Sequence, residues 1–576
     1  MEYNPAMKNI RKPVFFLFFF LSIFWFFVYS NLFAAWSTGT QSSIFRFREG
    51  LPEVLPFSQL DVAINYSMVY NRVLFGEYLF DEPLSSSTLN QIHPRSTTII
   101  FNQISPVGFP GIIVLMSVVL LPLMWLFGSY SVNLFLVGII PLIAVLTPVV
   151  LYRVLVPIFQ KRIALISAVL LYCMPLWWYY AAWPVQHHSL LIFCIVLFLY
   201  LAQRSIGNHI TWNHIAAAWG SGIAFALAIY LRPVELLWLI PLVVVLYIHK
   251  RNKLSVVYHL YPFAIGAGMI AVLFFYTQML FYGHPLATGY VIPQTTGVGG
   301  TVFGTDQPEG LLVRVLLPYG FNIMNLLYNA YHYLFVFVWP WTVLSFLGLG
   351  VIYRNRQRRS FQGQKQYAWY VLAVSLWLLF YYGSSAFIDN LSGQVATIGT
   401  SYTRYFLPIY VAALPLAVRG GISLILSLRS GYRIWGAIAL AGLLIGHGYQ
   451  VVYRGNDGIH ALEQRLAQFY EERTQVLAHT QPTAIIVTKT ADKYIFPYRR
   501  VMVTAEDEPE RFFPALMSVE EQGYPLFWYY HVPTDETAMI GSWNERLAPY
   551  QFRLSEPVWQ GYSMQLRRIE KIELIP

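Results

Sequence analysis

Charged residues are scarce in this sequence. They make up 11% of its 576 residues, whereas 56% are hydrophobic and 17% are aromatic. Ordinary soluble domains carry about a quarter charged residues. A water-exposed surface cannot be built from so few charges, so most of the chain must face lipid or pack against itself. The composition therefore excludes an ordinary soluble globular protein.

Cysteine is also nearly absent. The two cysteines, Cys173 and Cys194, both lie in apolar segments, so the chain has neither a disulfide framework nor a cysteine metal motif. The formal net charge is +10, but the basic residues lie in short clusters between apolar runs. A nucleic-acid-binding surface would need them on one hydrophilic face, so we expect no nucleic-acid partner.

Acidic residues divide the chain unevenly. Of the 28 Asp and Glu residues, 11 lie in residues 1–450 and 17 lie in residues 451–576. We therefore predict a boundary near Arg454, with a multi-span membrane domain over 1–453 and a small soluble α/β domain over 454–576.

The tail itself supports the α/β assignment. Helical periodicity runs over 459–480, and strand-like runs follow at 484–488, 500–504, 526–532 and 551–554. The tail contains no Gly-rich phosphate loop and no catalytic triad, which favours an accessory domain over a second active site.

Long apolar stretches fill the rest of the chain. A spanning helix needs about 20 mostly apolar residues, and no clear small-residue cleavage site marks the first stretch as a signal peptide. We predict about eleven spans, at 14–35, 132–152, 163–183, 187–203, 213–231, 234–248, 259–282, 330–352, 367–386, 404–426 and 434–452. An odd number of spans places the two termini on opposite sides of the membrane.

Basic residues orient these spans, because short loops rich in Lys and Arg stay cytoplasmic. Lys8, Arg11 and Lys12 predict a cytoplasmic N-terminus. Four later basic pairs then fall on the same side: Lys161/Arg162, Lys250/Arg251, Arg358/Arg359 and Arg429/Arg433. We therefore expect a multi-pass protein of the cell membrane whose C-terminal domain is extracytoplasmic.

One apolar stretch, residues 111–127, conflicts with this orientation if it crosses the membrane, because every later loop would then invert. We interpret it as a helix in the outer interface. Three regions on the outer side are too long to be simple turns, at 36–110, 283–329 and 387–403. Long ordered loops usually carry function.

Few ionisable residues lie near membrane depth, so each is a candidate functional residue. Asp61 begins a polar and aromatic helical stretch after the first span. Its carboxylate could take a proton from an acceptor hydroxyl or hold a divalent cation beside a phosphate. The plainer alternative is that Asp61 is a helix N-cap on an exposed loop.

Two arginines lie at the outer ends of spans. Arg404 precedes a late span, and Arg232 occupies a short outer turn. A guanidinium at this depth suits a phosphate at the headgroup level, because its planar fork binds oxygens in pairs. Alternatively, each could extend to the interface as arginines routinely do, and Arg232 could pair with Glu235.

His187 and His188 also begin a span on the outer side. Adjacent helical residues point about 100° apart, which makes this pair a poor joint metal site. We favour interfacial or acceptor-contacting roles for both histidines.

Taken together, four stretches resemble the GT-C class of polyprenyl-phosphate-sugar-dependent membrane glycosyltransferases, related to protein mannosyltransferases and lipid A aminoarabinose transferase. The stretches occur in the same order as in the family. They are Asp61 with Tyr66, Tyr70 and Gly76; Ile104-Ser-Pro-Val-Gly-Phe-Pro110; Phe281-Tyr-Gly-His-Pro-Leu-Ala-Thr-Gly-Tyr290; and Ser401-Tyr-Thr-Arg-Tyr-Phe-Leu-Pro408. The resemblance extends over roughly residues 1–450.

The resemblance implies roles for particular residues. It implies that Asp61 is the catalytic base or an acid that orients the acceptor, that Arg404 is a clamp on the lipid phosphate, and that Arg232 is a weaker second clamp. We also expect substrate contacts from residues in or near these stretches: Tyr66, His187, His188, Tyr290 and Tyr405. The implied partners are a polyprenyl-phosphate sugar donor, membrane lipids, and a glycan, lipid or protein acceptor.

The sequence also departs from the family pattern. Many relatives carry a carboxylate where this chain has Gln186-His187-His188, and the first-loop acid is often doubled, whereas Asp61 is flanked by Leu60 and Val62. A divalent cation is thus conceivable but not favoured, and we expect neither a metal site nor another cofactor.

The predicted function is transfer of a sugar at the outer face of the membrane. The alternative is a transporter or flippase for a lipid-linked or small polar substrate. Transporters tend to contain internal repeats with polar groups at mid-membrane, whereas the ionisable residues here gather at one face.

Overall fold

The computed structural model describes residues 6–38, 59–129, 132–205, 211–248, 253–287, 320–385, 387, 396–504, 509–532, 536–561 and 563–572. The chain forms two compact units. The first comprises 1–34, 136–274 and 305–462, and the second comprises 35–135, 275–304 and 463–576.

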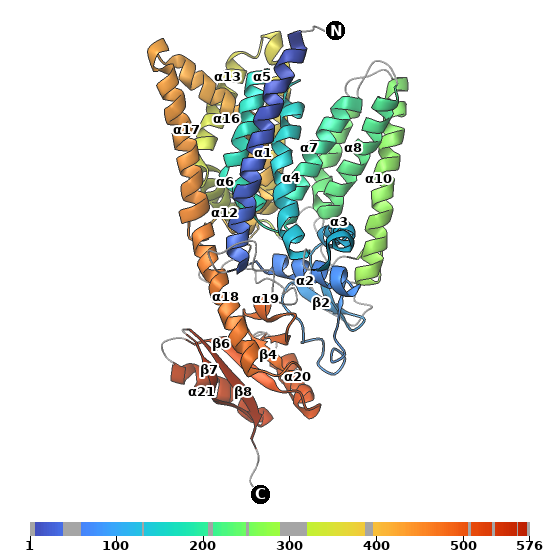
Figure 1. Cartoon of the computed structure of the whole chain (residues 1–576), viewed down its shortest axis with the longest axis vertical. Coiled ribbons are helices and arrows are strands. Elements are labelled where there is room, and N and C mark those ends of the chain that lie inside the picture. Colours follow the sequence, from blue (N-terminus) through green and yellow to red (C-terminus); the bar gives the residue numbers. More distant parts are fainter. Residues whose placement is uncertain are drawn as a thin grey trace. The chain divides into compact units, whose positions relative to one another are not determined.

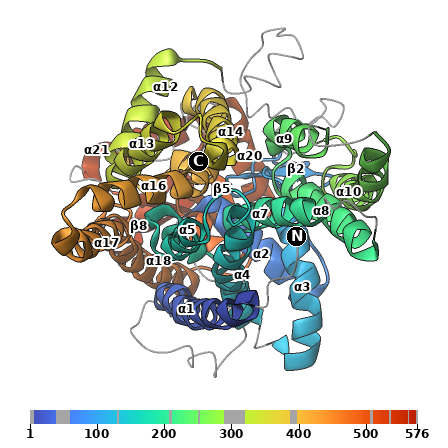
Figure 2. The ribbon, with the colours of Figure 1, turned by 90° about the horizontal axis from the view of Figure 1, so that it is seen from above.

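The first unit is a bundle of apolar helices (Figures 1 and 2). Those lying mainly within it are α1 (Ala6–Thr38), α4 (Val132–Leu155), α5 (Lys161–Cys173), α6 (Pro175–Ala181), α7 (His187–Ser205), α8 (Trp212–Leu231), α9 (Leu236–Ile248), α10 (Lys253–Tyr282), α12 (Ile323–Asn329), α13 (Trp339–Arg354), α14 (Gln362–Leu378), α15 (Ser401–Tyr405), α16 (Leu407–Ser427) and α17 (Arg433–Tyr449).

Seven helices in the described residues are long and apolar enough to cross a membrane, and two bent pairs raise the number to nine. All eleven predicted spans contain helix. The two stretches outside the nine are 234–248 and 367–386, where α9 and α14 are only 13 and 17 residues long. Residues 111–127 form the 17-residue helix α3 (Gly111–Phe127), whose interfacial position stays a prediction.

Prolines explain the bent pairs. The predicted span 163–183 is broken between α5 and α6, which meet at 55°. Met174 adopts an extended conformation (φ −65°, ψ 127°) because the residue before a proline, here Pro175, is disfavoured in the α region. The predicted span 330–352 bends by 91° at the start of α13, where Pro340 lies in the first turn.

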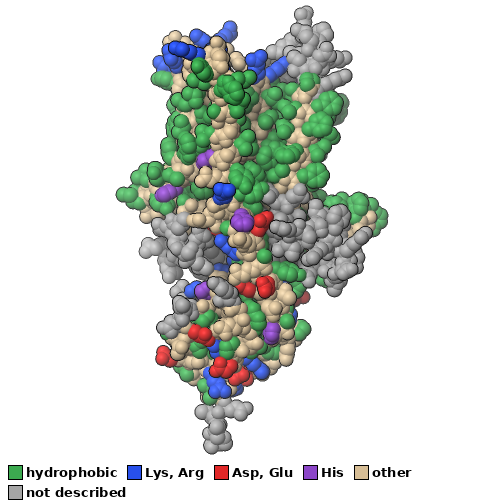
Figure 3. Space-filling view, turned by 60° about the vertical axis from the view of Figure 1, so that its left-hand side comes forward, with side chains coloured by type: hydrophobic (Ala, Val, Ile, Leu, Met, Phe, Trp, Pro, Cys, Tyr) green, Lys and Arg blue, Asp and Glu red, His purple; other side chains and the backbone are tan. Residues whose placement is uncertain are grey.

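Hydrophobic side chains cover most of the face of the bundle that Figure 3 shows. Phe20 is 65% exposed, and Tyr261 and Val272 are each 70% exposed. Such side chains suit lipid rather than water. Lys and Arg side chains gather at one end of the bundle (Figure 3).

The second unit combines helices with two sheets. Its helices are α2 (Leu60–Phe75), α3, most of α18 (Ile459–His479), α19 (Asp492–Ile495), α20 (Pro509–Glu521) and α21 (Glu536–Leu547). A small antiparallel sheet has the order β1-β3-β2, with β1 Phe80–Asp81, β2 Thr97–Ile100 and β3 Gln103–Pro106.

The larger sheet has the order β5-β4-β6-β8-β7. Its strands are β4 (Ile485–Thr488), β5 (Arg500–Val503), β6 (Leu526–His531), β7 (Phe552–Gln560) and β8 (Met564–Lys571). β4 is parallel to β5 and β6, whereas β8 is antiparallel to β6 and β7. The predicted α/β character of the tail is confirmed, and β8, α20 and α21 are elements that the sequence patterns did not predict.

The first loop and the tail share one hydrophobic core. Leu84 and Ile92 from the loop are buried with Ile485, Met502 and Trp528 of the larger sheet. The domain boundary predicted near residue 454 is based on composition and stays a prediction. The second compact unit contains residues from both sides of that boundary.

Helices α13 and α16 lie side by side (Figure 2) and pack through glycine. A Cβ added to Gly348 would lie 2.0 Å from the Leu416 carbonyl oxygen, and one added to Gly420 would lie 2.0 Å from the Leu344 carbonyl oxygen. Both contacts are with backbone, which cannot move aside without separating the helices. Close approach therefore requires glycine at both positions.

This packing makes a prediction for Gly348→Ala. The added methyl should force the helices apart and lower the free energy of unfolding by about 1–3 kcal/mol, as overpacking typically does. Gly350→Ala on the same helix is the control, because its Cβ meets no atom within 4 Å. Thermal unfolding in detergent measures both, and equal melting temperatures for the two variants would contradict the packing account.

Candidate active site

Arg232 follows helix α8 in the first unit. It is extended (φ −151°, ψ 94°), as the following Pro233 favours, and only 5% exposed. Its Nη1 lies 3.1 Å from Oε1 of Glu235. The alternative that Arg232 pairs with Glu235 is therefore confirmed.

Two tyrosines hold the same guanidinium. Arg232 Nη2 donates a hydrogen bond of 2.5 Å to the hydroxyl of Tyr382. The guanidinium carbon lies 5.0 Å from the centre of the Tyr382 ring and 4.5 Å from that of Tyr405. The two rings stack with centroids 4.5 Å apart. Cation–π contacts of this kind are stronger in desolvated positions.

Arg404 joins the cluster through Tyr405. It lies on α15, and its guanidinium carbon is 5.3 Å from the centre of the Tyr405 ring. Its Nη2 donates a hydrogen bond of 2.7 Å to the Ser401 hydroxyl. Tyr405 thus contacts both arginines that the sequence predicts as phosphate-binding residues. The structure therefore brings together two guanidinium groups that are far apart in the sequence.

His187 and His188 lie beside these arginines, close enough for electrostatic interaction with both. The centroids of the two histidine rings are 3.9 Å apart. The expectation that the rings diverge by about 100° was therefore wrong about the side chains. His187 is the first residue of α7, where no preceding helical turn restricts its rotamer.

The tautomer of His188 follows from its neighbour. Its Nδ1 lies 3.0 Å from Oε1 of Gln186, an oxygen that can only accept, so Nδ1 carries the proton. Nε2 is then an acceptor, and it is buried with no hydrogen-bond partner among the described residues. The His188 ring lies 5.9 Å from that of Tyr405, so this acceptor belongs to the arginine cluster.

Two guanidinium groups and one carboxylate meet in this cluster among the residues that the structure describes. Arg232 and Arg404 each carry a positive charge, whereas Glu235 supplies one carboxylate, which also accepts a hydrogen bond from Trp238. Two guanidinium groups that lie this close together attract an anionic ligand. The guanidinium groups, held by the aromatic rings, can therefore bind a phosphate through paired N–H donors.

Two contributors were not predicted as site residues. Glu235 was considered only as a partner of Arg232, and Tyr382 was not singled out. The available signal for Tyr382 was its position in Tyr381-Tyr382-Gly383, near the end of a predicted span.

Asp61 and Tyr66 belong to the second unit. Asp61 is exposed and occupies the second position of α2, whose N-cap is Gln59. The alternative that Asp61 is the N-cap is therefore wrong, although a carboxylate in the first turn still favours the helix dipole. Tyr66 is fully buried and donates its hydroxyl to Asn133. Tyr290 lies outside the described residues.

No group of three His, Cys, Asp or Glu side chains that could hold a metal ion occurs in the part of the chain that the structure describes.

No protein-family model matches the sequence, and no curated protein matches it either. Solved structures do resemble the chain, and they define its fold class. The protein has the GT-C fold, and it is a multi-pass membrane protein. The GT-C fold predicted from the four sequence stretches is confirmed.

Two GT-C structures illustrate the likeness. Archaeal oligosaccharyltransferase AglB from Archaeoglobus fulgidus, in complex with an inhibitory peptide and a dolichol-phosphate, is 13% identical, with a TM-score of 0.52 over 92% of this chain and 72% of its own. ArnT from Cupriavidus metallidurans, bound to undecaprenyl phosphate, is 12% identical, with a TM-score of 0.50 over 96% of this chain and 97% of its own. At these identities the likeness is one of fold.

The buried Arg232–Glu235 pair can be tested with the Glu235→Gln variant. Removing the carboxylate charge breaks the buried ion pair with the Arg232 guanidinium, which should lower the free energy of unfolding by about 3 kcal/mol. Denaturant or thermal unfolding in detergent measures the change. Glu77→Gln, at an exposed position, should unfold like the wild type, and a Glu235→Gln protein as stable as this control would contradict the assignment.

Proposed function

We propose that this protein transfers a sugar from a polyprenyl-phosphate-linked donor to a lipid, glycan or protein acceptor at the outer face of the membrane. The observation that carries the proposal is the cluster of Arg232 and Arg404 around Tyr405. Such a cluster suits a phosphate group, and it occurs in a chain with the GT-C fold.

The donor class is supported by the two similar structures. AglB was solved with a dolichol-phosphate and ArnT with undecaprenyl phosphate. Both ligands join a phosphate to a long prenyl chain, which requires an anion site next to an apolar surface. The arginine cluster at the ends of apolar helices meets this requirement.

In the proposed reaction, an acceptor hydroxyl or amine attacks the anomeric carbon of the sugar. The bond between that carbon and the phosphate oxygen breaks, and the phosphate leaves with the electron pair. Arg404 and Arg232 stabilise the charge that develops on the leaving phosphate. His188 Nε2 would accept a hydrogen bond from a sugar or acceptor hydroxyl, and His187, Tyr405 and Tyr290 would add substrate contacts.

Asp61 would act as the base in this scheme. Its exposed carboxylate can accept the proton released by the acceptor, and its position in the first turn of α2 fixes its backbone. The buried Tyr66 would hold the helix through Asn133 rather than touch the sugar directly.

The proposed orientation follows the basic residues. Lys and Arg gather at one end of the helical bundle (Figure 3). Arg232, Arg404 and His187 lie at the opposite helix ends from Arg153, Arg204 and Arg429. Since basic ends stay inside, we assign the arginine cluster to the outer side, with a cytoplasmic N-terminus and an extracytoplasmic C-terminal domain.

The proposed role of Arg404 in donor binding can be tested with the Arg404→Ala variant. Loss of a charge-assisted bond to phosphate should weaken undecaprenyl phosphate binding by about tenfold or more, since such bonds contribute about 1.5–3 kcal/mol. Tryptophan fluorescence or scintillation proximity with purified protein measures the affinity. Arg429→Ala is the matched control, because Arg429 follows the other end of α16. Equal affinities for the two variants would contradict the clamp role.

The base assignment makes a prediction for Asp61→Asn. This variant should form at least a hundredfold less product, because general base catalysis typically contributes about 10²–10⁴. Product is measured by mass spectrometry of glycans and lipids from cells that lack the protein and carry each variant. Glu77→Gln, an exposed acid just beyond the other end of α2, should restore wild-type product. Undiminished product with Asp61→Asn would remove Asp61 from the mechanism.

A further inference from the structure

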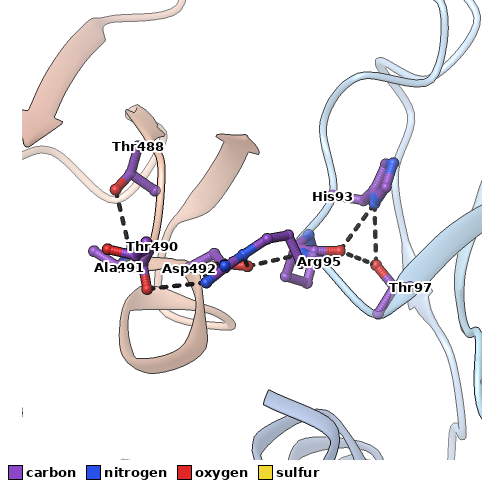
Figure 4. A network of polar contacts seen from close by, with 8 residues as sticks. His93, Arg95, Thr97, Thr488, Thr490, Ala491 and Asp492 are labelled. Carbon is purple, nitrogen blue, oxygen red and sulfur yellow. Dashed lines mark hydrogen bonds and ion pairs between the residues drawn. The ribbon is translucent and has the colours of Figure 1, made fainter. Parts of the chain in front are cut away.

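Within the second unit, one arginine of the first loop is bound by the tail. The Arg95 backbone N–H donates a hydrogen bond of 2.8 Å to Oδ2 of Asp492. Its Nη2 donates to Oδ1 of Asp492 at 2.6 Å and to the Thr490 carbonyl at 3.2 Å. Asp492 is fully buried. Figure 4 shows the guanidinium extended from the loop into this group.

Asp492 lies close after the end of a central parallel strand. It follows β4, the strand that lies between the two parallel partners β5 and β6. Open α/β sheets bind ligands outside the carboxyl ends of their parallel strands. In this sheet the residues that follow β4 bind Arg95 instead. The Arg95 side chain therefore occupies the position at which such sheets usually bind a ligand.

Further contacts tie the loop to β5 and to the segment that precedes it. Arg500 on β5 lies 3.1 Å from the buried carboxylate of Glu82, and Phe80 packs against Phe496 with ring centroids 4.9 Å apart. Burial raises the pKa of the Glu82 carboxyl although the Arg500 charge opposes the rise. This pair therefore carries a desolvation cost, and Arg95–Asp492 has the richer set of bonds.

The same residues support the helix that carries Asp61. Asp492 is the first residue of α19, and α19 packs against α2. The far end of α2 is joined to the loop, because the Asn71 side chain donates to the carbonyls of Glu77 and Leu79. The α2 helix is thus held by α19 on one side and by the start of the loop that carries Arg95.

We propose that Arg95 and Asp492 are positioning residues for Asp61. This inference rests on the proposed function. The ion pair holds α19 and the loop against each other, and together they fix α2 so that its carboxylate is in place when an acceptor arrives. The tail therefore takes part in transfer by supporting the base rather than by touching the donor.

The test combines three measurements on Asp492→Asn and on the milder Arg95→Lys, which keeps the charge but loses the planar fork. Hydrogen exchange of the α2 amides should increase, while that of α16 should not. Undecaprenyl phosphate affinity should stay within twofold of wild type. Product in cells, per amount of folded protein, should fall about tenfold or more, since small displacements of a catalytic group have large effects.

Glu520→Gln is the matched control, because it breaks the Lys571–Glu520 pair (3.3 Å), which lies within the tail and does not involve the loop. This control should leave all three measurements unchanged. Faster α2 exchange with undiminished product would overturn the proposal, and so would lost product with unchanged α2 exchange. Absence of product from the wild type would instead refute the transferase function, and the exchange data would still report on the coupling.

Discussion

The Arg232 guanidinium is buried at the end of a bundle of apolar helices, where a charge is costly unless it is compensated. The surrounding residues offset the desolvation of the guanidinium. Glu235 supplies the opposite charge, Tyr382 accepts a hydrogen bond, and the Tyr405 ring lies 4.5 Å from the guanidinium carbon. Tyr405 also contacts the partly buried Arg404, so the ring that stabilises one guanidinium brings a second beside it.

The second guanidinium determines which kind of ligand the cluster suits. A structural ion pair needs only one cation and one anion, whereas Arg232 and Arg404 bring two guanidinium groups to the same tyrosine ring next to apolar helices. A phosphate joined to a prenyl chain is complementary to both features. The buried acceptor nitrogen of His188 adds a neutral group suited to a hydroxyl.

Much of this arrangement could be predicted from the sequence. Apolar length located the helices, because lipid demands long runs without charge. The rarity of ionisable residues near membrane depth identified Arg232 and Arg404. Tyr382 was missed because a tyrosine at the end of a span resembles an ordinary interfacial residue. The bends at Pro175 and Pro340 were missed because hydropathy alone does not show where a helix breaks.

The second unit was less predictable. Short apolar runs indicated β4, β5 and β6, whereas charged residues interrupt the sequence of β8. The pairing of Arg95 with Asp492 joins residues 397 positions apart, and nothing local in either stretch indicates the other. The shared core that includes Leu84 and Ile92 escaped prediction for the same reason, because composition changes at 454 whereas packing depends on contacts in space.

The central claim is that the arginine cluster binds the phosphate of a polyprenyl-linked donor. An electron cryo-microscopy structure with undecaprenyl phosphate bound tests it most directly. The account predicts phosphate oxygens at hydrogen-bonding distance, about 3 Å, from the guanidinium of Arg404 or Arg232. Phosphate density away from both arginines would contradict it.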